Sequence, residues 1–183
     1  MNTTQPLDAP TTPAATGERA DLLEALAHHR HFLRLTTHDL TDEQAGRRTT
    51  VSELCLGGLI KHVTSVERNW VAFIQEGPAA MGDFTRMTED DWARRADEFR
   101  LLPGETLAGV LEEYAEVARR TDELVAALPD LDVSHPLPPA PWNEPGARWS
   151  ARRVLLHLIG ETSQHAGHAD IIRESLDGTK SMG

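Results

Sequence analysis

The chain has 183 residues and a formal net charge of −11, with 18 Lys and Arg against 29 Asp and Glu. This length suits one domain with a substantial core. The acidic balance argues against a nucleic-acid partner, because binding to phosphates requires a basic surface. No apolar run approaches the ~20 residues of a membrane span, so no membrane partner is expected.

The N-terminal residues and the number of cysteines indicate the cellular compartment of the protein. The first residues lack both a basic start and an apolar segment, so no secretory signal is predicted. Cys55 is the only cysteine, which excludes an internal disulfide and fits a reducing environment. We therefore expect a cytoplasmic protein. Residues 1–17 are mostly Thr, Pro and Ala, which predicts a disordered tail, and residues 179–183 form a short C-terminal tail.

Apolar positions with helical spacing begin at Glu18 and predict a first long helix that ends near His38. Three histidines of this helix, His28, His29 and His31, point in different directions. We interpret them as solvated or interhelical side chains. Thr41 and Gln44 then have the spacing of a capping box for a short helical turn.

A second long helix is predicted over residues 51–77, with Thr50 or Ser52 as its cap and Gly77 at its end. His62 lies in the middle of its apolar face. Residues 78–103 form an irregular connection with a short helix at residues 90–99. A third long helix is predicted over residues 104–128, with a solvated acidic face.

Residues 129–149 are rich in proline, and we expect neither helix nor strand there. Ser150 has the properties of a cap for a fourth long helix that ends at Gly178. Four helices without a strand predict an all-α fold, a four-helix bundle over residues 18–178.

The fourth helix carries His157, Glu161, His165 and His168 in a stripe about 80° wide, at roughly 100° per residue. A helix that faced a core would place Leu and Val in that stripe, and one that faced water would place Lys and Glu. Residues i and i+4 of a helix can hold one ion, as Glu161 with His165 could, and as His157 with Glu161 could. With His62 from the second helix, the set becomes two imidazoles and one carboxylate.

This ligand set is that of many catalytic zinc sites and also of the facial triad of non-haem iron. Cys55 lies about 10 Å along the helix from His62, so the two side chains cannot easily bind one ion. The predicted site is therefore open, which favours chemistry over a structural role. A ferritin-type di-iron centre is rejected, because the chain has no Glu-x-x-His.

Two segments resemble the actinobacterial DinB-like branch of the DinB/YfiT-like superfamily, namely GGLIKHVTSVERNW and SARRVLLHLIGETSQHAGHADIIRESLDG. The resemblance covers nearly the whole chain after residue 17. It implies a four-helix bundle in up-down-down-up order and the metal ligands His62, Glu161 and His165. Glutamate at position 161 departs from the usual His-x-x-x-His of this superfamily. The same replacement is found in the related mycothiol-dependent maleylpyruvate isomerase, a zinc enzyme.

The resemblance also implies thiol chemistry: a metal-dependent S-transferase or isomerase that uses a low-molecular-weight thiol such as mycothiol on a small electrophile. Relatives in bacilli use bacillithiol instead. The metal would be divalent, with zinc favoured and nickel or iron as alternatives. His157 and His168 are the candidates for proton transfer. Carboxylate-binding candidates are Arg47, Arg48, Arg153 and Arg173.

Two other hypotheses stay open at this point. One is a non-catalytic, metal-binding stress or sensor protein, which a fourth protein ligand from His157 or His168 would favour. The other is an iron-dependent oxygen enzyme. An exposed face of the bundle would allow a homodimer.

Overall fold

The computed structural model describes residues 16–181. Most of the predicted N-terminal tail and residues 182–183 of the predicted C-terminal tail lie outside this range. Four long helices form the bundle: α1 (Glu18–Leu35), α3 (Leu56–Glu76), α5 (Leu107–Ala127) and α6 (Ala151–Asp177). The predicted all-α four-helix bundle is confirmed. No described helix is long and apolar enough to cross a membrane.

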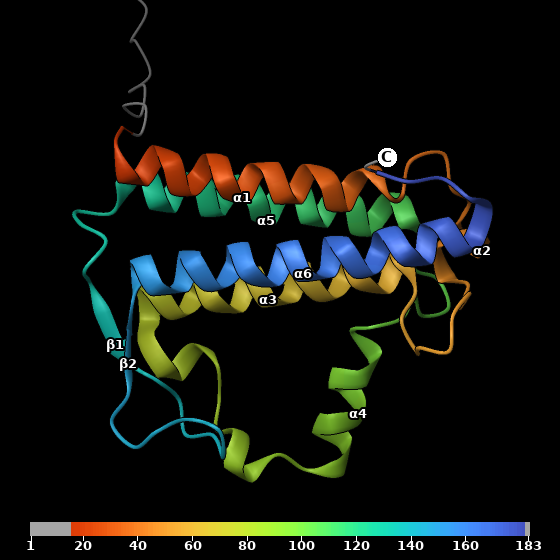
Figure 1. Cartoon of the computed structure of the whole chain (residues 1–183). Helices are drawn as coiled ribbons and strands as arrows, with labels where there is room; N and C mark the ends of the chain where they lie inside the picture. The colour runs from red at the N-terminus through yellow and green to blue at the C-terminus, as the bar shows by residue number, and fades with distance from the viewer. Residues whose placement is uncertain (1–15, 182–183) are drawn as a thin grey trace, which may run out of the picture.

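The helices follow the up-down-down-up order that the family resemblance implies. Figure 1 shows α1 and α6 running in one direction and α3 and α5 in the other. The closest packing joins α1 to α6, α3 to α5, and α3 to α6. The α3–α6 pair is antiparallel, so the middle of each helix faces the middle of the other.

The chain leaves the bundle between α3 and α5. This connection contains η1 (Gly77–Ala80), η2 (Phe84–Arg86) and α4 (Glu89–Asp97), while the short α2 (Asp42–Gly46) precedes α3. In Figure 1 the connection extends from the α3–α6 side of the bundle, on the opposite side from α1. Residues 77–99 therefore cover the face on which α3 and α6 meet.

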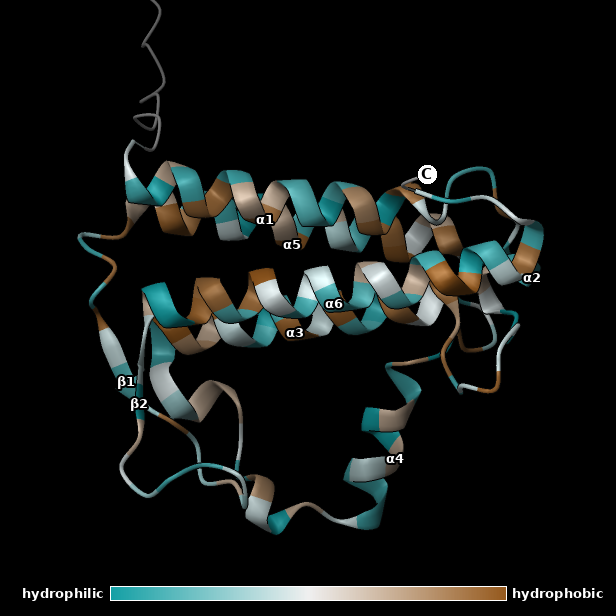
Figure 2. Ribbon diagram, viewed as in Figure 1, coloured by the Kyte–Doolittle hydropathy of each residue, from teal (hydrophilic) through white to brown (hydrophobic). Residues whose placement is uncertain are grey.

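The core lies between the long helices. Figure 2 shows hydrophobic residues concentrated on the facing surfaces of the helices and hydrophilic residues in much of α4. One buried cluster includes Leu59 of α3 and Ala166 of α6, and a second includes Val71 of α3 and Val154 of α6. Burial of a Val or Leu side chain stabilises the fold by about 1.5–3 kcal/mol. These two clusters fix the register of α3 against α6.

A buried ion pair crosses the interior of the bundle. Arg30 of α1 donates a hydrogen bond of 3.1 Å to Glu67 of α3, and both side chains are almost completely buried. Arg30 also donates to Asp122 of α5 at 2.9 Å. Burial lowers the pKa of Arg30, but the combined attraction of Glu67 and Asp122 outweighs that effect and raises it. Three helices are thus connected by one guanidinium group.

Local capping explains where most helices begin. The capping box of Thr41 and Gln44 is present, and Ser150 accepts a hydrogen bond of 3.2 Å from the backbone N–H of Arg153. The predicted start of the second long helix was wrong, since α3 begins at Leu56. The hydroxyls of Thr50 and Ser52 bind the N–H two residues further on and form local turns instead of a helix cap.

The proline-rich segment does contain strands, contrary to our prediction. Strands β1 (Ser134–Pro136) and β2 (Arg148–Ser150) pair in an antiparallel ladder. Proline is tolerated here because each strand has only three residues and Pro136 lies at the end of one. The ladder anchors the loop at residues 137–147. That loop contacts η2 through a hydrogen bond of 3.1 Å from the Phe84 N–H to the Pro139 carbonyl.

Gly58 allows the connection to lie directly against α3. A Cβ atom at this position would fall 2.0 Å from the carbonyl oxygen of Phe99. Cys55 packs at the same place, with its Sγ 3.7 Å from that oxygen and its side chain buried. The backbone at Phe99 therefore rests on the beginning of α3, close to His62.

We predict that Gly58→Ala destabilises the protein by about 1–3 kcal/mol, because the added methyl group collides with backbone that cannot rotate away. Gly160→Ala on α6 is the matched control. A Cβ atom there meets nothing within 4 Å, and alanine favours helix, so its stability should be equal or higher. Urea unfolding of both variants measures the difference. Equal stability of the two variants would contradict the close approach.

We predict that Glu67→Ala costs about 3–5 kcal/mol, because it leaves the buried Arg30 charge without its main partner. Glu116→Ala removes an exposed partner of Arg119 and should leave the stability nearly unchanged. The double variant Arg30→Met/Glu67→Leu should recover most of the loss, since it removes both charges. Thermal unfolding of the set tests this; a mild effect of Glu67→Ala would show that Arg30 is solvated.

Candidate metal centre

His62 is held at the α3–α6 contact by its neighbours. Its side chain is 7% exposed, and its ring stacks on Phe99 with centroids 3.9 Å apart and an interplanar angle of 24°. Its ring also meets that of His165 edge to face at 5.0 Å. The register set by the apolar clusters on either side places His62 opposite the middle of α6.

Glu161 and His165 lie one turn apart on α6 and face His62. Nε2 of His165 lies 3.4 Å from Oε2 of Glu161. Candidate ligand atoms of His62, Glu161 and His165 all lie within 4.8 Å of one another. Atoms bound to the same zinc ion at about 2.0–2.2 Å lie up to roughly 4 Å apart, so small rotations would bring the three onto one ion. Two imidazoles and a carboxylate therefore fit a divalent metal.

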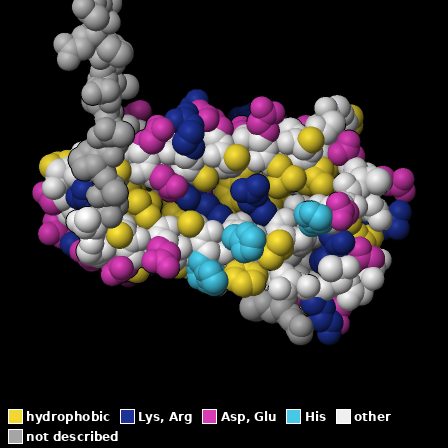
Figure 3. All heavy atoms as spheres, turned by 90° about the horizontal axis from the view of Figure 1, so that it is seen from above, with side chains coloured by type: hydrophobic (Ala, Val, Ile, Leu, Met, Phe, Trp, Pro, Cys, Tyr) yellow, Lys and Arg dark blue, Asp and Glu magenta, His cyan; other side chains and the backbone are white. Residues whose placement is uncertain are grey.

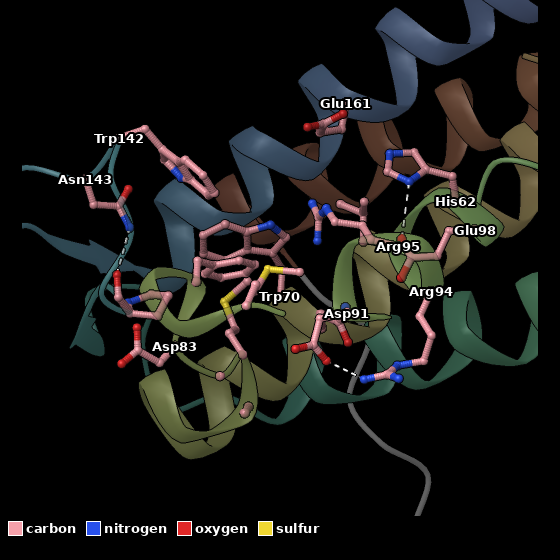
Figure 4. A pocket seen from close by; sticks show the side chains of 18 of the residues that line it. His62, Trp70, Asp83, Asp91, Arg94, Arg95, Glu98, Trp142, Asn143 and Glu161 are labelled. Carbon is pink, nitrogen blue, oxygen red and sulfur yellow. Dashed lines mark hydrogen bonds and ion pairs between the residues drawn. The ribbon is translucent and has the colours of Figure 1, made fainter. Parts of the chain in front are cut away.

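The remaining nitrogen of His62 faces a carboxylate. Nδ1 of His62 is buried without a hydrogen bond from any described residue, and Oε2 of Glu98 lies 3.6 Å from it. Figure 4 shows the ring of His62 between Glu98 on one side and Glu161 on the other. Glu98 also accepts a hydrogen bond of 3.0 Å from Ser65. Burial raises the pKa of Glu98, but its contacts with His62 and Ser65 outweigh that effect and lower it.

Glu161 has the charge that a metal ligand needs. Its pKa is lowered, mainly because His165 lies against the carboxylate, and this outweighs the effect of burial. Nε2 of His157 lies 3.7 Å from Oε1 of the same carboxylate. The pKa of His157 is lowered, chiefly by burial, which favours the neutral imidazole. Glu161 is thus flanked by two imidazoles on its own helix.

The two histidines predicted to transfer protons lie in different places. His157 lines the cavity beside the cluster, in edge-to-face contact with Trp70 at 5.0 Å and with Trp149 at 5.2 Å. His168 lies behind His165, with the Nδ1 atoms of the two rings 3.4 Å apart. His168 is not among the residues that line the cavity. It therefore contacts a candidate ligand rather than the space beside it.

A cavity of about 1030 Å³ opens beside the three candidate ligands. Its walls come from α3, α6, the connection of residues 80–99 and the loop between β1 and β2 (Figure 4). Such a volume is typical of a site for a ligand of drug size. The cavity is much larger than a metal ion requires, so a small molecule can reach the cluster.

The arginines at the cavity differ from the four suggested by the sequence. Arg47 and Arg173 are paired with Glu43 and Asp177, and Arg153 lies over the ring of Trp149 at 4.2 Å. Arg48 pairs with Glu53. None of the four lines the cavity, whose wall contains Arg86, Arg94 and Arg95 instead.

The sequence did not identify Arg94 and Arg95 as residues of the site. They belong to the connection between α3 and α5, whose position relative to the bundle cannot be predicted from the sequence. Arg94 pairs with Asp91 of its own helix. Arg95 has no ion-pair partner within 4.0 Å in the described part of the chain, and its guanidinium lies 5.7 Å from the ring of Phe84. A positive charge without a close ion-pair partner among the described residues is therefore present in the cavity wall.

The histidine cluster of α1 is separate from this site. His28 and His31 are exposed and His29 is partly exposed, as the sequence predicted. Figure 3, which looks onto the α1 side of the molecule, shows histidine side chains at the surface. His28 packs against Phe32 at 4.8 Å, and none of the three lines the large cavity.

Comparisons with known proteins identify the family of the chain. A protein-family model described as Mycothiol-S-transferase matches residues 21–178, which is most of the chain. This is a DinB-like family, so the resemblance stated from the sequence is confirmed. A comparison with curated proteins found no match. The chain therefore belongs to the mycothiol-S-transferase family.

Proposed function

We propose that this protein is a metal-dependent enzyme that acts on a small electrophile with mycothiol. It is either an S-transferase, which joins the thiol to the electrophile, or an isomerase, which uses the thiol as a co-substrate. One observation carries the proposal: His62, Glu161 and His165 converge at the wall of a large cavity. The family of the chain is named for transfer to this thiol. His62, Glu161 and His165 would hold a divalent metal, for which zinc is favoured and nickel or iron are alternatives.

When bound, such a metal would keep a coordinated thiol deprotonated at neutral pH, because coordination lowers the pKa of the thiol well below its ordinary value of about 8.5. The protein's own residues supply the surroundings. The ionised Glu161 contributes negative charge to the ligand set. Phe99 and Trp70 line the cavity with apolar surface, which limits water around a nucleophile.

Proton transfer is assigned to His157 rather than to His168. His157 lines the cavity and lies 3.7 Å from Glu161, so its ring can accept a proton from a group that enters beside the cluster. His168 contacts the ring of His165 and does not line the cavity. We propose that His168 orients that ring.

The open cavity favours an enzyme over a metal-binding sensor. A closed structural site would need a fourth protein ligand, and the cluster in the described residues has three. Arg95, which has no acidic partner within 4.0 Å among the described residues, would favour an electrophile that carries a carboxylate. Homodimer formation and a cytoplasmic location stay predictions from the sequence.

We predict about one zinc per chain in protein purified without a nickel column or chelator. His62→Ala, Glu161→Ala and His165→Ala should each lose the metal and the thiol transfer, because two ligands do not hold zinc tightly. Far-UV circular dichroism should show an unchanged helical fold. Mass spectrometry of the metal content checks the prediction.

The outcomes of this experiment are distinct. Full metal occupancy in one variant would remove that residue from the ligand set. One iron per chain would favour the alternative of an oxygen-dependent iron enzyme. Wild-type protein that binds no divalent metal would contradict the proposed function.

We also predict that Glu98→Ala weakens zinc binding by about 10–100-fold, since carboxylates that hold the second nitrogen of a ligand histidine have effects of that size. Glu98→Gln keeps an acceptor for Nδ1 of His62 and should recover part of the affinity. Glu105→Ala, which removes the partner of Lys61 outside the cavity, is the control. Competition with a chromogenic chelator gives the three affinities, and equal values would show that Glu98 does not orient His62.

A further inference from the structure

Tryptophan side chains form the end of the cavity that lies away from His62. Three of the four tryptophans of the chain line the cavity: Trp70, Trp142 and Trp149. Figure 4 shows Trp70 and Trp142 on one side and His62 on the opposite side. The candidate metal ligands and the tryptophans thus occupy two ends of one continuous space.

Two of the tryptophans are part of the fixed wall. Trp70 and Trp149 stack at 4.6 Å with an interplanar angle of 16°, and Arg153 also covers Trp149. His157 contacts both indoles by its edge and lies beside Glu161. Through His157, the stacked tryptophans are therefore in contact with the surroundings of the candidate metal centre.

Trp142 differs because its ring is open to the cavity. It is 64% exposed, and its aromatic neighbour is Phe84 at 5.5 Å. The loop that carries it is held by the β1–β2 ladder and by the bond from Phe84 to Pro139. A large apolar ring is thus kept at the cavity mouth, although its exposure to water is unfavourable.

Two amide side chains, those of Asn69 and Asn143, line the same cavity. Asn69 lines the cavity half-buried, and its side chain makes no hydrogen bond to any described residue. Asn143 donates to the Pro138 carbonyl at 2.9 Å, which leaves its own side-chain oxygen free to accept a bond. The tryptophan end therefore combines flat apolar surface with unused donors and acceptors.

We infer that the tryptophan end of the cavity binds a sugar-like, polyhydroxylated ring, which stacks on Trp142 and is bound at its hydroxyls by Asn69 and Asn143. Such a ring has apolar C–H faces and a polar rim, as this surface requires. An aryl group would cover the indole but would leave the amides unpaired, which is unfavourable on burial. The space beside Trp142 is thereby assigned to the part of the thiol molecule that does not react, and not to the electrophile.

This inference rests on the proposed function and extends it to the part of the thiol that does not react. Mycothiol carries its cysteine on a glucosaminyl inositol, which consists of two polyhydroxylated rings. Binding of these rings at Trp142 would direct the sulfur toward His62, Glu161 and His165. Binding energy from a non-reacting group can position the reacting atom in this way.

The direct test is isothermal titration calorimetry with the thiol-free glucosaminyl inositol as the probe and the zinc-loaded protein as the receptor. Trp142→Ala and Asn69→Leu should each weaken binding of this fragment by about tenfold. Trp142→Phe, which keeps a flat ring, should recover part of the affinity. Trp92→Ala is the matched control, because Trp92 is also exposed, at 47%, but does not line the cavity.

A kinetic measurement accompanies the titration. The ratio of kcat/KM for mycothiol to that for N-acetyl-L-cysteine should fall about tenfold in Trp142→Ala and stay unchanged in Trp92→Ala. If wild-type protein converts mycothiol but does not bind the fragment, the inference is wrong and the proposed function stands. Equal effects of Trp142→Ala and Trp92→Ala would also overturn it. Fragment binding without conversion of mycothiol would instead contradict the proposed function and leave the sugar site in place.

Discussion

The antiparallel contact between α3 and α6 is the constraint on which the candidate site depends. Leu59 with Ala166, and Val71 with Val154, belong to buried clusters on either side of His62. A shift of one helix along the other would expose apolar surface in both clusters. The apolar core therefore holds the polar side chains of the site opposite each other, and the ligands need no strong mutual attraction to meet.

Helical periodicity in the sequence was sufficient to predict the four long helices, although not every helix end. Four amphipathic segments predict four helices, and the i,i+4 spacing of Glu161 and His165 by itself places both side chains on one helix face. The pairing of His62 with them required the assumption that an imidazole on an apolar face needs a partner. The structure brings the three side chains together, with candidate ligand atoms within 4.8 Å of one another, and their role as metal ligands stays a prediction.

The remaining walls of the cavity could not be predicted, because they depend on contacts between distant segments. Glu98 meets His62 only because Gly58 lets the backbone at Phe99 lie on α3. Trp142 reaches the cavity through a two-stranded ladder that proline content argued against. Short strands and close backbone approaches have little signature in a single sequence. The start of α3 was misjudged for a related reason, since hydroxyl side chains cap turns as well as helices.

The burial of Cys55 has a consequence for the reactivity of its thiol. Mixed disulfides form when an accessible thiolate meets an oxidised thiol, and their formation requires access to the sulfur. The side chain of Cys55 is 1% exposed and lies beneath the backbone of Phe99. The only cysteine of the chain can react only after the connection lifts from α3. In the folded protein Cys55 is thus shielded from disulfide exchange with small oxidised thiols.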